Sequence, residues 1–571
     1  MSQPYTKGLC HGTIAEDTLF PYPLPARGET ESLHNLLSQL RRFGATHVDS
    51  AQIDRDAEVP KSVLEGLAKM GIFGASLPKD HGGLGLSHTA FARLMEELSG
   101  IDASLGVTVG AHLSLAARSL VLYGSKAQKE KFLPRMARGE SLGAFALSEE
   151  GAGSDPAALR SYATLRDDSY VLRGDKAWVT NGPTADVFIL FARTSPPDTN
   201  EKPRITAFVA ERSDGIQSSE KERKLGVRGN GTSDLSFNGV VLGKDAILAE
   251  PGRGFKVAME VLNEGRITLA AGSIGLAKRI VRLAIARVQD RRAFGRSIGE
   301  FGLIKDKIAM MVAEIYALES ATYLTTGLAD ARTTDYSVES AICKIIGSEV
   351  LMRIADEGVQ IAAGAGYSER LPFERFLRDA RVNTIFYGTS EILRCFIAMA
   401  GMHGATREVL SVGRVVREPL KALGLLSEFA TRKAKSALTR QAPRLTRSHA
   451  LLHRERQIVE HYTERLSSNV DRVLRRHGRN LSEMQYTQRR VADIMIELYA
   501  LSASIARTTR AIEERGEEGA RRELTLTHIY ASIAQKRLAD AANGFDSNDD
   551  ELRKSAASKA YADGGYPLDI L

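Results

Sequence analysis

The chain has 571 residues, of which 43% are hydrophobic and 26% charged, and its formal net charge is +7. This length exceeds what one compact core supports, so three or four domains are expected, and the composition is that of a soluble globular protein. The three cysteines, Cys10, Cys343 and Cys395, form no C-x-x-C pair, which argues against a disulfide framework and a cysteine-rich metal site, and no metal is expected.

No targeting or membrane-spanning segment is evident in the sequence. There is no run of 18 or more apolar residues, and the first twenty residues lack both the apolar core of a signal peptide and an arginine-rich transit pattern. We therefore expect a cytoplasmic protein in a reducing compartment, with the inner face of the membrane as a peripheral location.

The patterns along the chain follow the order helices, strands, helices. Helical apolar spacing, as in "FARLMEELSG", gives way near residue 142 to short β-branched or aromatic runs such as "VFILFART", and it returns near residue 251. This order predicts a mainly α fold with a central β domain. The predicted domains are a helical one at 1–140, an antiparallel, barrel-like one at 141–250, a four-helix bundle at 251–403 and an extra helical one at 404–571.

The last domain combines an apolar stripe with a basic segment. Val491, Ile494, Leu498, Leu501 and Ile505 recur at helical spacing. Between residues 431 and 480, thirteen Lys or Arg stand against four Asp or Glu, a local charge of +9 that leaves the rest of the chain near −2. Any attraction to an anionic surface therefore belongs to this segment.

Two short motifs supply candidate ligand-binding groups. In "ALSEEGAGSD", small residues and hydroxyls let backbone amides approach a ligand and donate hydrogen bonds to it. Downstream, "KAWVTNG" holds Trp178, the single tryptophan of the chain. Each motif alone is weak evidence, because a lone tryptophan in a strand is more often a core residue than the wall of a cofactor site.

Together with "DRRAFGR" and "YGTSEILR", in this α-β-α order, the two motifs resemble those of the acyl-CoA dehydrogenases, FAD enzymes that introduce a double bond next to a thioester. The resemblance covers nearly the whole chain. Stretches such as "FPYP", "GAHLSL" and "KAQKEKFLPRMARGE" look most like the very-long-chain branch, whose members carry an extra C-terminal domain. The resemblance implies FAD, an acyl-CoA substrate, a role in fatty acid oxidation and an electron-transfer flavoprotein as partner.

The resemblance also implies a flavin site within the chain. Ser148 and the amide of Leu147 would face the flavin ring, and Trp178 and Thr180 would close its other side. The flavin would therefore lie between the "SEEG" loop and a strand of the β domain.

Two further pairs belong to this implied site. Ser154 would meet the CoA thioester arm, and Arg266 would lie beside the substrate pocket. Thr389 and Glu391, after the signature glycine, would lie near the adenosine half of the cofactor.

A second implied group acts across the interface of a homodimer. Arg291 and Phe294 of "DRRAFG", with Gln360 and Gly364 of "QIAAGAG", would reach the pyrophosphate and adenine of the adjacent subunit's FAD. Arginine suits a pyrophosphate because it forms paired, charge-assisted hydrogen bonds. Outside the motif, a solvated surface charge is the simpler interpretation of Arg291.

The catalytic base is the main departure from the family. The reaction needs a base for the α-proton, usually a glutamate, and the matching position is Tyr387. A phenol with an ordinary pKa near ~10 is ionised in about one molecule in a thousand at pH 7, a handicap of roughly 4 kcal/mol. Some members carry the base directly before the arginine that matches Arg266. That position is Gly265, and Glu264, the alternative base, points about 100° away on a regular helix, where a surface glutamate is the simpler interpretation.

Three functions remain open on the sequence. The chain is an acyl-CoA dehydrogenase with a relocated or weakened base, or a catalytically silent scaffold that binds FAD and a thioester. In the third, the flavin performs another reaction on an acyl-thioester, such as elimination or reduction, with Tyr387 as the proton donor.

The basic segment at 444–479 predicts an amphipathic helix. Its apolar stripe is formed by Leu452, Val459, Tyr462, Leu466, Val470 and Val473, and its basic residues include Arg454, Arg472, Arg475, Arg476 and Arg479. Such a helix lies on an anionic membrane surface or packs on its own domain with a solvated basic face. Nucleic acid is disfavoured because aromatic residues scarcely interleave the basic ones.

Overall fold

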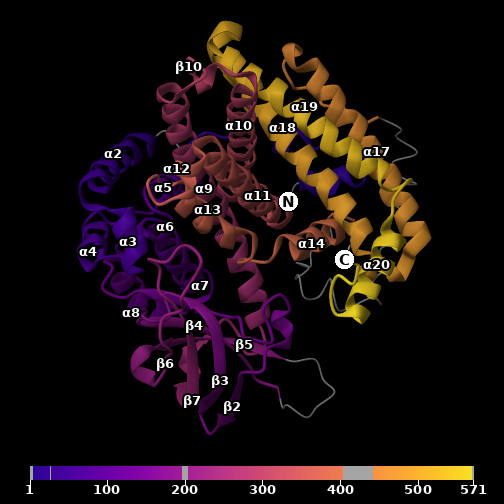
Figure 1. Cartoon of the computed structure of the whole chain (residues 1–571). Coiled ribbons are helices and arrows are strands. Elements are labelled where there is room, and N and C mark those ends of the chain that lie inside the picture. The colour runs from indigo at the N-terminus through magenta and orange to yellow at the C-terminus, as the bar shows by residue number, and fades with distance from the viewer. Residues whose placement is uncertain (1–3, 26–27, 196–203, 403–441, 569–571) are drawn as a thin grey trace.

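The computed structural model describes residues 4–25, 28–195, 204–402 and 442–568. The predicted fold class is confirmed, since helices surround a central β domain and an extra helical region follows the bundle (Figure 1). Residues 404–441 of the predicted C-terminal domain, with part of the basic segment, lie outside the described residues.

The N-terminal part is helical as predicted. Its elements are α1 (Tyr5–Leu9), α2 (Thr30–His47), α3 (Ser50–Asp56), α4 (Lys61–Lys69), α5 (His88–Ile101), α6 (Ala103–Gly110), η4 (Ala111–Ala117), α7 (Arg118–Tyr123) and α8 (Lys126–Ala137). The segment η4 is a π-helix that widens the turn between α6 and α7, and such turns are frequent at functional sites. In the described residues, Ala103–Tyr123 is the one stretch long and apolar enough to span a membrane, but 78% of its most apolar window is buried in the protein.

The β domain is a mixed sheet in the order β6-β7-β3-β2-β4-β5-β8, with β1 paired to β4. Most pairs are antiparallel as predicted, but β4 runs parallel to β1 and β2. Parallel pairs need long connections, and the "SEEG" loop lies in one of them. The strands are β1 (Gly143–Ala146), β2 (Tyr162–Arg166), β3 (Ser169–Thr180), β4 (Val187–Arg193), β5 (Ile205–Glu211), β6 (Gln217–Ser218), β7 (Thr232–Gly243) and β8 (Ile247–Leu248).

The bundle is built on long helices, and its elements are α9 (Gly254–Asp290), α10 (Gly302–Ala331), α11 (Ser337–Ala362), α12 (Gly364–Tyr367), α13 (Phe373–Arg381) and α14 (Ser390–Met402). A hairpin of β9 (Arg292–Ala293) and β10 (Arg296–Ser297) joins α9 to α10 at the end of the molecule opposite the β domain (Figure 1). The 37 residues of α9 span about 55 Å.

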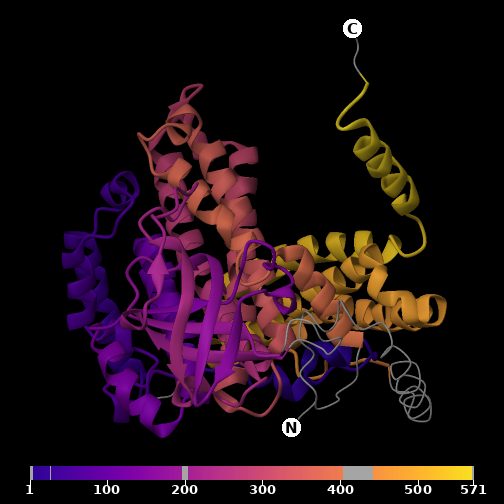
Figure 2. The same ribbon diagram turned by 90° about the horizontal axis from the view of Figure 1, so that it is seen from below.

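The C-terminal region consists of α17 (His453–His477), α18 (Gln485–Gly519), α19 (Arg521–Asn543) and α20 (Asp550–Asp563). The predicted stripe on α18 is fully buried, and α18 packs on α10 and α14. By contrast, α20 has no buried residue and projects from the body (Figure 2).

One apolar core joins the bundle to both ends of the chain. It includes residues of α1, α9–α11, α14 and α17–α19. The hydroxyl of Tyr5 donates to Oγ of Ser502 at 2.6 Å, deep within this core. Helices α17–α19 are therefore part of the bundle's interior, whereas α20 is not.

Candidate active site

Tyr387 lies in the turn between the short helix Val382–Thr384 and α14, with a left-handed backbone of φ 58°. Such a conformation is strained for a bulky residue and is typical of functional sites. Burial raises the pKa of the Tyr387 phenol above its ordinary value, and a hydrogen bond with Ser114 of η4 offsets only part of this. The phenol is therefore protonated at neutral pH and is not a ready base.

Gly265 on α9 lies directly under the Tyr387 ring. A Cβ atom at position 265 would lie 2.3 Å from Cε1 of Tyr387 and 3.0 Å from Leu115. Carbon atoms cannot approach so closely, so the ring fills the space that a side chain at 265 needs. The packing of Tyr387, at one possible position of the base, therefore requires a glycine at 265, the other possible position.

Glu264 points into a different set of contacts. Its carboxylate accepts hydrogen bonds from His88 at 3.0 Å, Arg118 at 3.0 Å and Tyr336 at 2.7 Å. Burial alone would raise the pKa of Glu264, but the hydrogen bond from His88 and the charge of Arg118 lower it to about 2. A carboxylate whose Oε1 accepts three hydrogen bonds is a weak proton acceptor, so these contacts favour a structural role, and Glu264 as a base stays a prediction.

Two buried cations hold the backbone of the Tyr387 turn. Arg266 donates from Nε to the Tyr387 carbonyl at 3.3 Å, and Lys344 of α11 donates to the Gly388 carbonyl at 2.8 Å. Burial lowers the pKa of Arg266 to about 10. Burial, with a smaller effect of the Arg266 charge, lowers the pKa of Lys344 to about 7. Sequence analysis missed Lys344, and the available signal was a lysine inside the apolar run "AICKIIG".

A narrow cavity of about 50 Å³ adjoins Tyr387 between α5, α6 and α9. Its lining includes Ser99, Gly106, Gly110, Thr268 and Gly272. These small side chains give a path between the helices, but the volume is far below that of a long acyl chain.

Trp178 is held out from the β domain by a bulge in β3. The pairing of β3 with β7 shifts register between Lys176 and Val179, and Trp178 has φ 54° and a 55% exposed side chain. Its backbone N–H donates to Oδ1 of Asp234 at 2.9 Å. An exposed indole at a strained position indicates a surface on which a flat ring stacks.

The "SEEG" loop lies beside this bulge. The carbonyl of Ser148 accepts from the N–H of Ala177 at 2.9 Å, and Leu147 belongs to the apolar cluster against which Tyr387 packs. The structure thus brings together Leu147, Ser148, Trp178 and Thr180. Hydroxyl and amide donors next to an exposed indole fit a flavin ring. Ser154 is also exposed but lies further along the loop.

A buried ion pair fixes the loop to β3. Lys176 donates to the Glu149 carboxylate at 2.7 Å and to the Leu147 carbonyl at 3.3 Å. Burial alone would raise the pKa of Glu149, but the Lys176 charge lowers it. Sequence analysis missed this pair, because nothing in the two motifs indicated that they touch.

Four predicted cofactor residues lie elsewhere. Arg291, Phe294, Gln360 and Gly364 are exposed near the ends of α9 and α11, and Phe294 is 94% exposed with φ 52°. Arg291 follows the last residue of α9 and lies 25 positions beyond Arg266, which corresponds to about 37 Å along the helix. One chain therefore does not bring them to the Trp178 site. Thr389 and Glu391 open α14, directly after the Tyr387 turn.

The stripe of the predicted basic helix is buried. All six apolar residues of the α17 stripe lie in the core, so α17 packs on its own domain. Arg475 pairs with Asp471, Arg472 with Asp546, and Arg454 donates to Ser532. The Arg479 side chain lies outside the described residues.

Family models match the chain in the order of its domains. The acyl-CoA dehydrogenase N-terminal, middle and C-terminal domain models match residues 30–140, 144–240 and 252–402. The ACAD9/ACADV C-terminal domain model matches residues 450–563.

Individual relatives match along the same length. A mitochondrial very long-chain specific acyl-CoA dehydrogenase of Rattus norvegicus is 36% identical over 578 residues, covering 99% of this chain and 88% of the relative. A probable acyl-CoA dehydrogenase of Bacillus subtilis is 31% identical and covers 86% of this chain and 82% of the relative. The crystal structure of an acyl-CoA dehydrogenase complexed with FAD from Bacillus anthracis has a TM-score of 0.82 at 28% identity, covering 100% of this chain and 97% of that one.

Proposed function

Because the chain belongs to the acyl-CoA dehydrogenase family, we propose that it is an FAD-dependent oxidoreductase acting on long-chain acyl-CoA thioesters in fatty acid oxidation. The observation that carries the proposal is the exposed Trp178 at the β3 bulge, beside the Ser148 loop. Similarity to a very long-chain enzyme over 99% of the chain supports the long-chain substrate.

The residues at hand divide the work of such a site. When bound, the flavin accepts a hydride from the substrate β-carbon. Ser148 and the amide of Leu147 would donate hydrogen bonds to the ring, and Trp178 and Thr180 would close its other side. Ser154 would meet the thioester arm, and Arg266 would lie beside the substrate pocket.

The α-proton has no ready acceptor at the Tyr387 turn. The phenol is protonated, and Glu264 is fully paired in its own network. Lys344 and Arg266 hold the turn so that the Tyr387 ring closes the pocket against water. We therefore expect dehydrogenation to be slow, and a silent FAD-binding and thioester-binding scaffold is its limiting case.

One observation favours a second reaction at the same site. The raised pKa of Tyr387 suits a proton donor better than a proton acceptor. In a reduction of an α,β-unsaturated thioester, Tyr387 would donate its proton to the α-carbon, and the reduced cofactor, when bound, would supply the hydride that the β-carbon needs. The phenolate would then recover a proton through Ser114, its hydrogen-bond partner.

Rapid mixing of the FAD-loaded protein under anaerobic conditions separates these functions. Loss of flavin absorbance near ~450 nm with a saturated long-chain acyl-CoA supports dehydrogenation. Recovery of that absorbance, when prereduced protein meets an enoyl-CoA, supports the reduction. Tight binding of both thioesters without either change supports the scaffold, and a chain that takes up no FAD would overturn all three.

Assembly and location follow from the same proposal. A homodimer is proposed because Arg291 and Phe294 lie too far from Trp178 to act on the same cofactor within one chain. An electron-transfer flavoprotein is the proposed electron partner. Exposed arginines within 444–479 support a peripheral place at the inner membrane face of a cytoplasmic protein, with charge rather than an apolar face as the attraction.

A further inference from the structure

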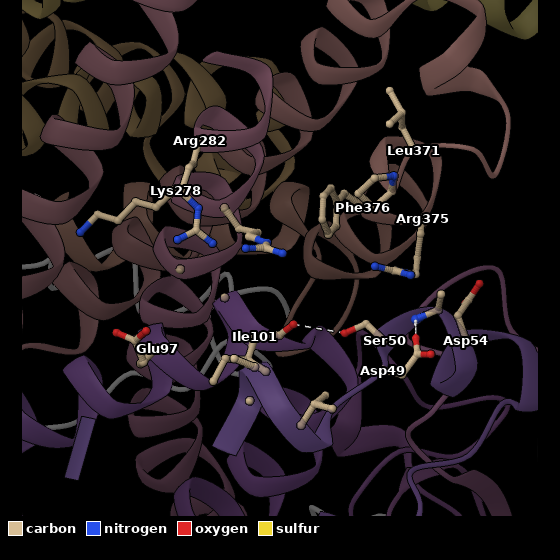
Figure 3. A pocket seen from close by; sticks show the side chains of 18 of the residues that line it. Asp49, Ser50, Asp54, Glu97, Ile101, Lys278, Arg282, Leu371, Arg375 and Phe376 are labelled. Carbon is tan, nitrogen blue, oxygen red and sulfur yellow. Dashed lines mark hydrogen bonds between the residues drawn. The ribbon is translucent and has the colours of Figure 1, made fainter. Parts of the chain in front are cut away.

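A pocket of about 970 Å³ lies between the N-terminal helices and the bundle, and Tyr387 is not part of its lining. Its walls come from α2, α3 and α5 on one side and from α9 and α13 on the other, with side chains of both walls turned into it (Figure 3). We call it the arginine pocket, and we define it by Arg41, Arg93, Arg279, Arg282 and Arg375. Its volume is that of a small-molecule site.

One wall of the arginine pocket is neutralised within the protein. Glu97 accepts hydrogen bonds from Arg41 at 2.8 Å and from Arg93 at 2.9 Å. From the facing wall, Lys278 of α9 reaches across and donates to the buried carboxylate of Glu96 at 2.8 Å. These charges are satisfied and need no ligand.

The facing wall carries arginines without such partners. Within the described part of the chain, Arg279, Arg282 and Arg375 form no ion pair with a carboxylate, although all three line the pocket. Arg279 and Arg282 are one turn apart on α9, and like charges at that spacing destabilise a helix. Burial lowers the pKa of Arg279, and the charges of Arg282 and Arg375 lower it further.

Arg375 has contacts that fix its direction. Its guanidinium lies 5.6 Å from the ring centre of Phe376, and Asp49 lines the same pocket. The carboxylate of Asp49 is itself engaged, because it accepts the N–H groups of Ala51 and Gln52 at the start of α3. Arg375 therefore keeps donor groups free for the pocket.

Three like charges in a concave surface focus a positive potential on its interior. Guanidinium groups bind phosphate oxygens through paired, charge-assisted hydrogen bonds. The lining also includes the apolar side chains of Val48, Ile101 and Leu371, which suit an apolar part of the same ligand.

We propose that the arginine pocket binds an organic phosphate with an aromatic or apolar body, held by Arg279, Arg282 and Arg375. The site is separate from the proposed flavin and thioester site, so it does not depend on the proposed function. A second copy of the chain seated on the pocket is the competing occupant.

Titration calorimetry on the FAD-loaded full chain tests the proposal, with inorganic phosphate, pyrophosphate and adenosine diphosphate as probes. We expect adenosine diphosphate to bind at least ten times more tightly than inorganic phosphate. The double variant R279Q/R282Q should weaken that binding at least tenfold, because it removes two charged donors. R166Q, at an exposed arginine of β2 outside the pocket, should leave the affinity unchanged.

Flavin content and thermal unfolding of each variant confirm that it is folded before it is titrated. Absence of binding in the parent chain, or equal affinity in R279Q/R282Q and R166Q, would overturn the proposal. Equal affinities for inorganic phosphate and adenosine diphosphate would overturn the proposal that the ligand has an aromatic or apolar body. A lower sedimentation mass in R279Q/R282Q with unaltered phosphate affinity would assign the pocket to a second copy.

Discussion

Tyr387 and Gly265 occupy one volume, although 121 residues separate them in the sequence. A base at either position needs the other residue to be small or absent, because the 265 Cβ would lie 2.3 Å from the tyrosine ring. The pair therefore behaves as a single unit, and restoring the chemistry at 387 requires no change at 265.

Replacing Tyr387 with glutamate should create a competent base. Y387E places a carboxylate at the position where the Tyr387 ring lies against Gly265 and Ser114, on a turn whose backbone carbonyls are bound by Arg266 and Lys344. We expect flavin reduction by a long-chain acyl-CoA to be faster by about 100-fold or more, the usual scale of general-base catalysis. Stopped-flow absorbance measures the rate, with Y387F as the matched control. Equal rates in Y387E and Y387F would show that the missing carboxylate is not the limit.

A side chain at 265 should be costly only while the tyrosine is present. Gly265→Ala should lower the free energy of unfolding by about 1–3 kcal/mol, the usual cost of overpacking. In the double variant with Tyr387→Ala, most of that increment should disappear, because only the 3.0 Å approach to Leu115 is left. Urea unfolding measures all three proteins. Gly110→Ala is the control, because its Cβ would lie an ordinary 3.4 Å from Thr268, and a similar loss there would contradict the argument.

At the residue scale, the sequence predicted which positions belong to the candidate site but not which of them touch each other. The motifs predicted Tyr387, Gly265 and Trp178 as positions of interest from their neighbours in the chain. The clash between 265 and 387 and the Glu149–Lys176 pair depend on segments that meet only after folding. Residue spacing within one segment cannot predict a contact with a distant segment.

A buried polar network joins the elements around the site. His88 at the start of α5, Arg118 of α7, Glu264 of α9 and Asp330 of α10 form it, and Tyr336 adds the turn before α11. The network ties α5 to α9 and α10, and the small cavity lies between α5 and α9.

The His88 pair should make stability depend on pH. Burial alone would lower the pKa of His88, but hydrogen bonds with Asp330 and Glu264 raise it to about 9. A raised folded-state pKa gives stability that is complete below the unfolded pKa near ~6.5 and is lost as pH rises through the folded value. The difference in unfolding free energy between the parent chain and His88→Gln should thus shrink by about 3 kcal/mol or less between these limits.

Urea unfolding at several pH values measures this difference. The exposed His34 of α2 gives the control, since His34→Gln should show no such trend. A difference that stays constant from pH 6 to about 9 would mean that His88 is neutral in the folded protein.

Element prediction succeeded where periodicity was strong. The α18 stripe was predicted and is buried, whereas the β domain was predicted as antiparallel and is mixed. Alternation of side chains along a strand is the same in both pairings, so the sequence carries no signal for the parallel β1–β4 pair. The α17 stripe was predicted, but whether it faces lipid or protein depends on what α18 and α19 offer it.

At the scale of the whole molecule, α17–α19 share the core of the bundle, whereas α20 projects from it. Among described residues, α20 is anchored chiefly through the Arg490 pair with Asp550, while α17–α19 belong to the bundle's core. Removal of residues 550–571 should therefore leave flavin content unchanged and shift the melting temperature by less than about 2 °C, as for surface changes.

Removal of residues 450–571 is the contrasting truncation. It uncovers the apolar faces of α10 and α14, and we expect aggregation on expression. Circular dichroism and flavin absorbance follow both proteins. A drop of more than about 5 °C on losing only 550–571 would show that α20 supports the body.

The contact of Tyr5 with Ser502 sets an order of events during synthesis. The first helix leaves the ribosome long before its partner exists, and α14 is complete at residue 402 while α18 ends at residue 519. At a synthesis rate of about 5–20 residues per second, the apolar face of α14 is exposed for roughly 6–23 s before α18 is complete. We therefore expect the nascent protein to bind chaperones until translation is nearly finished. The N-terminal helix and α18 can pack on each other only at that stage.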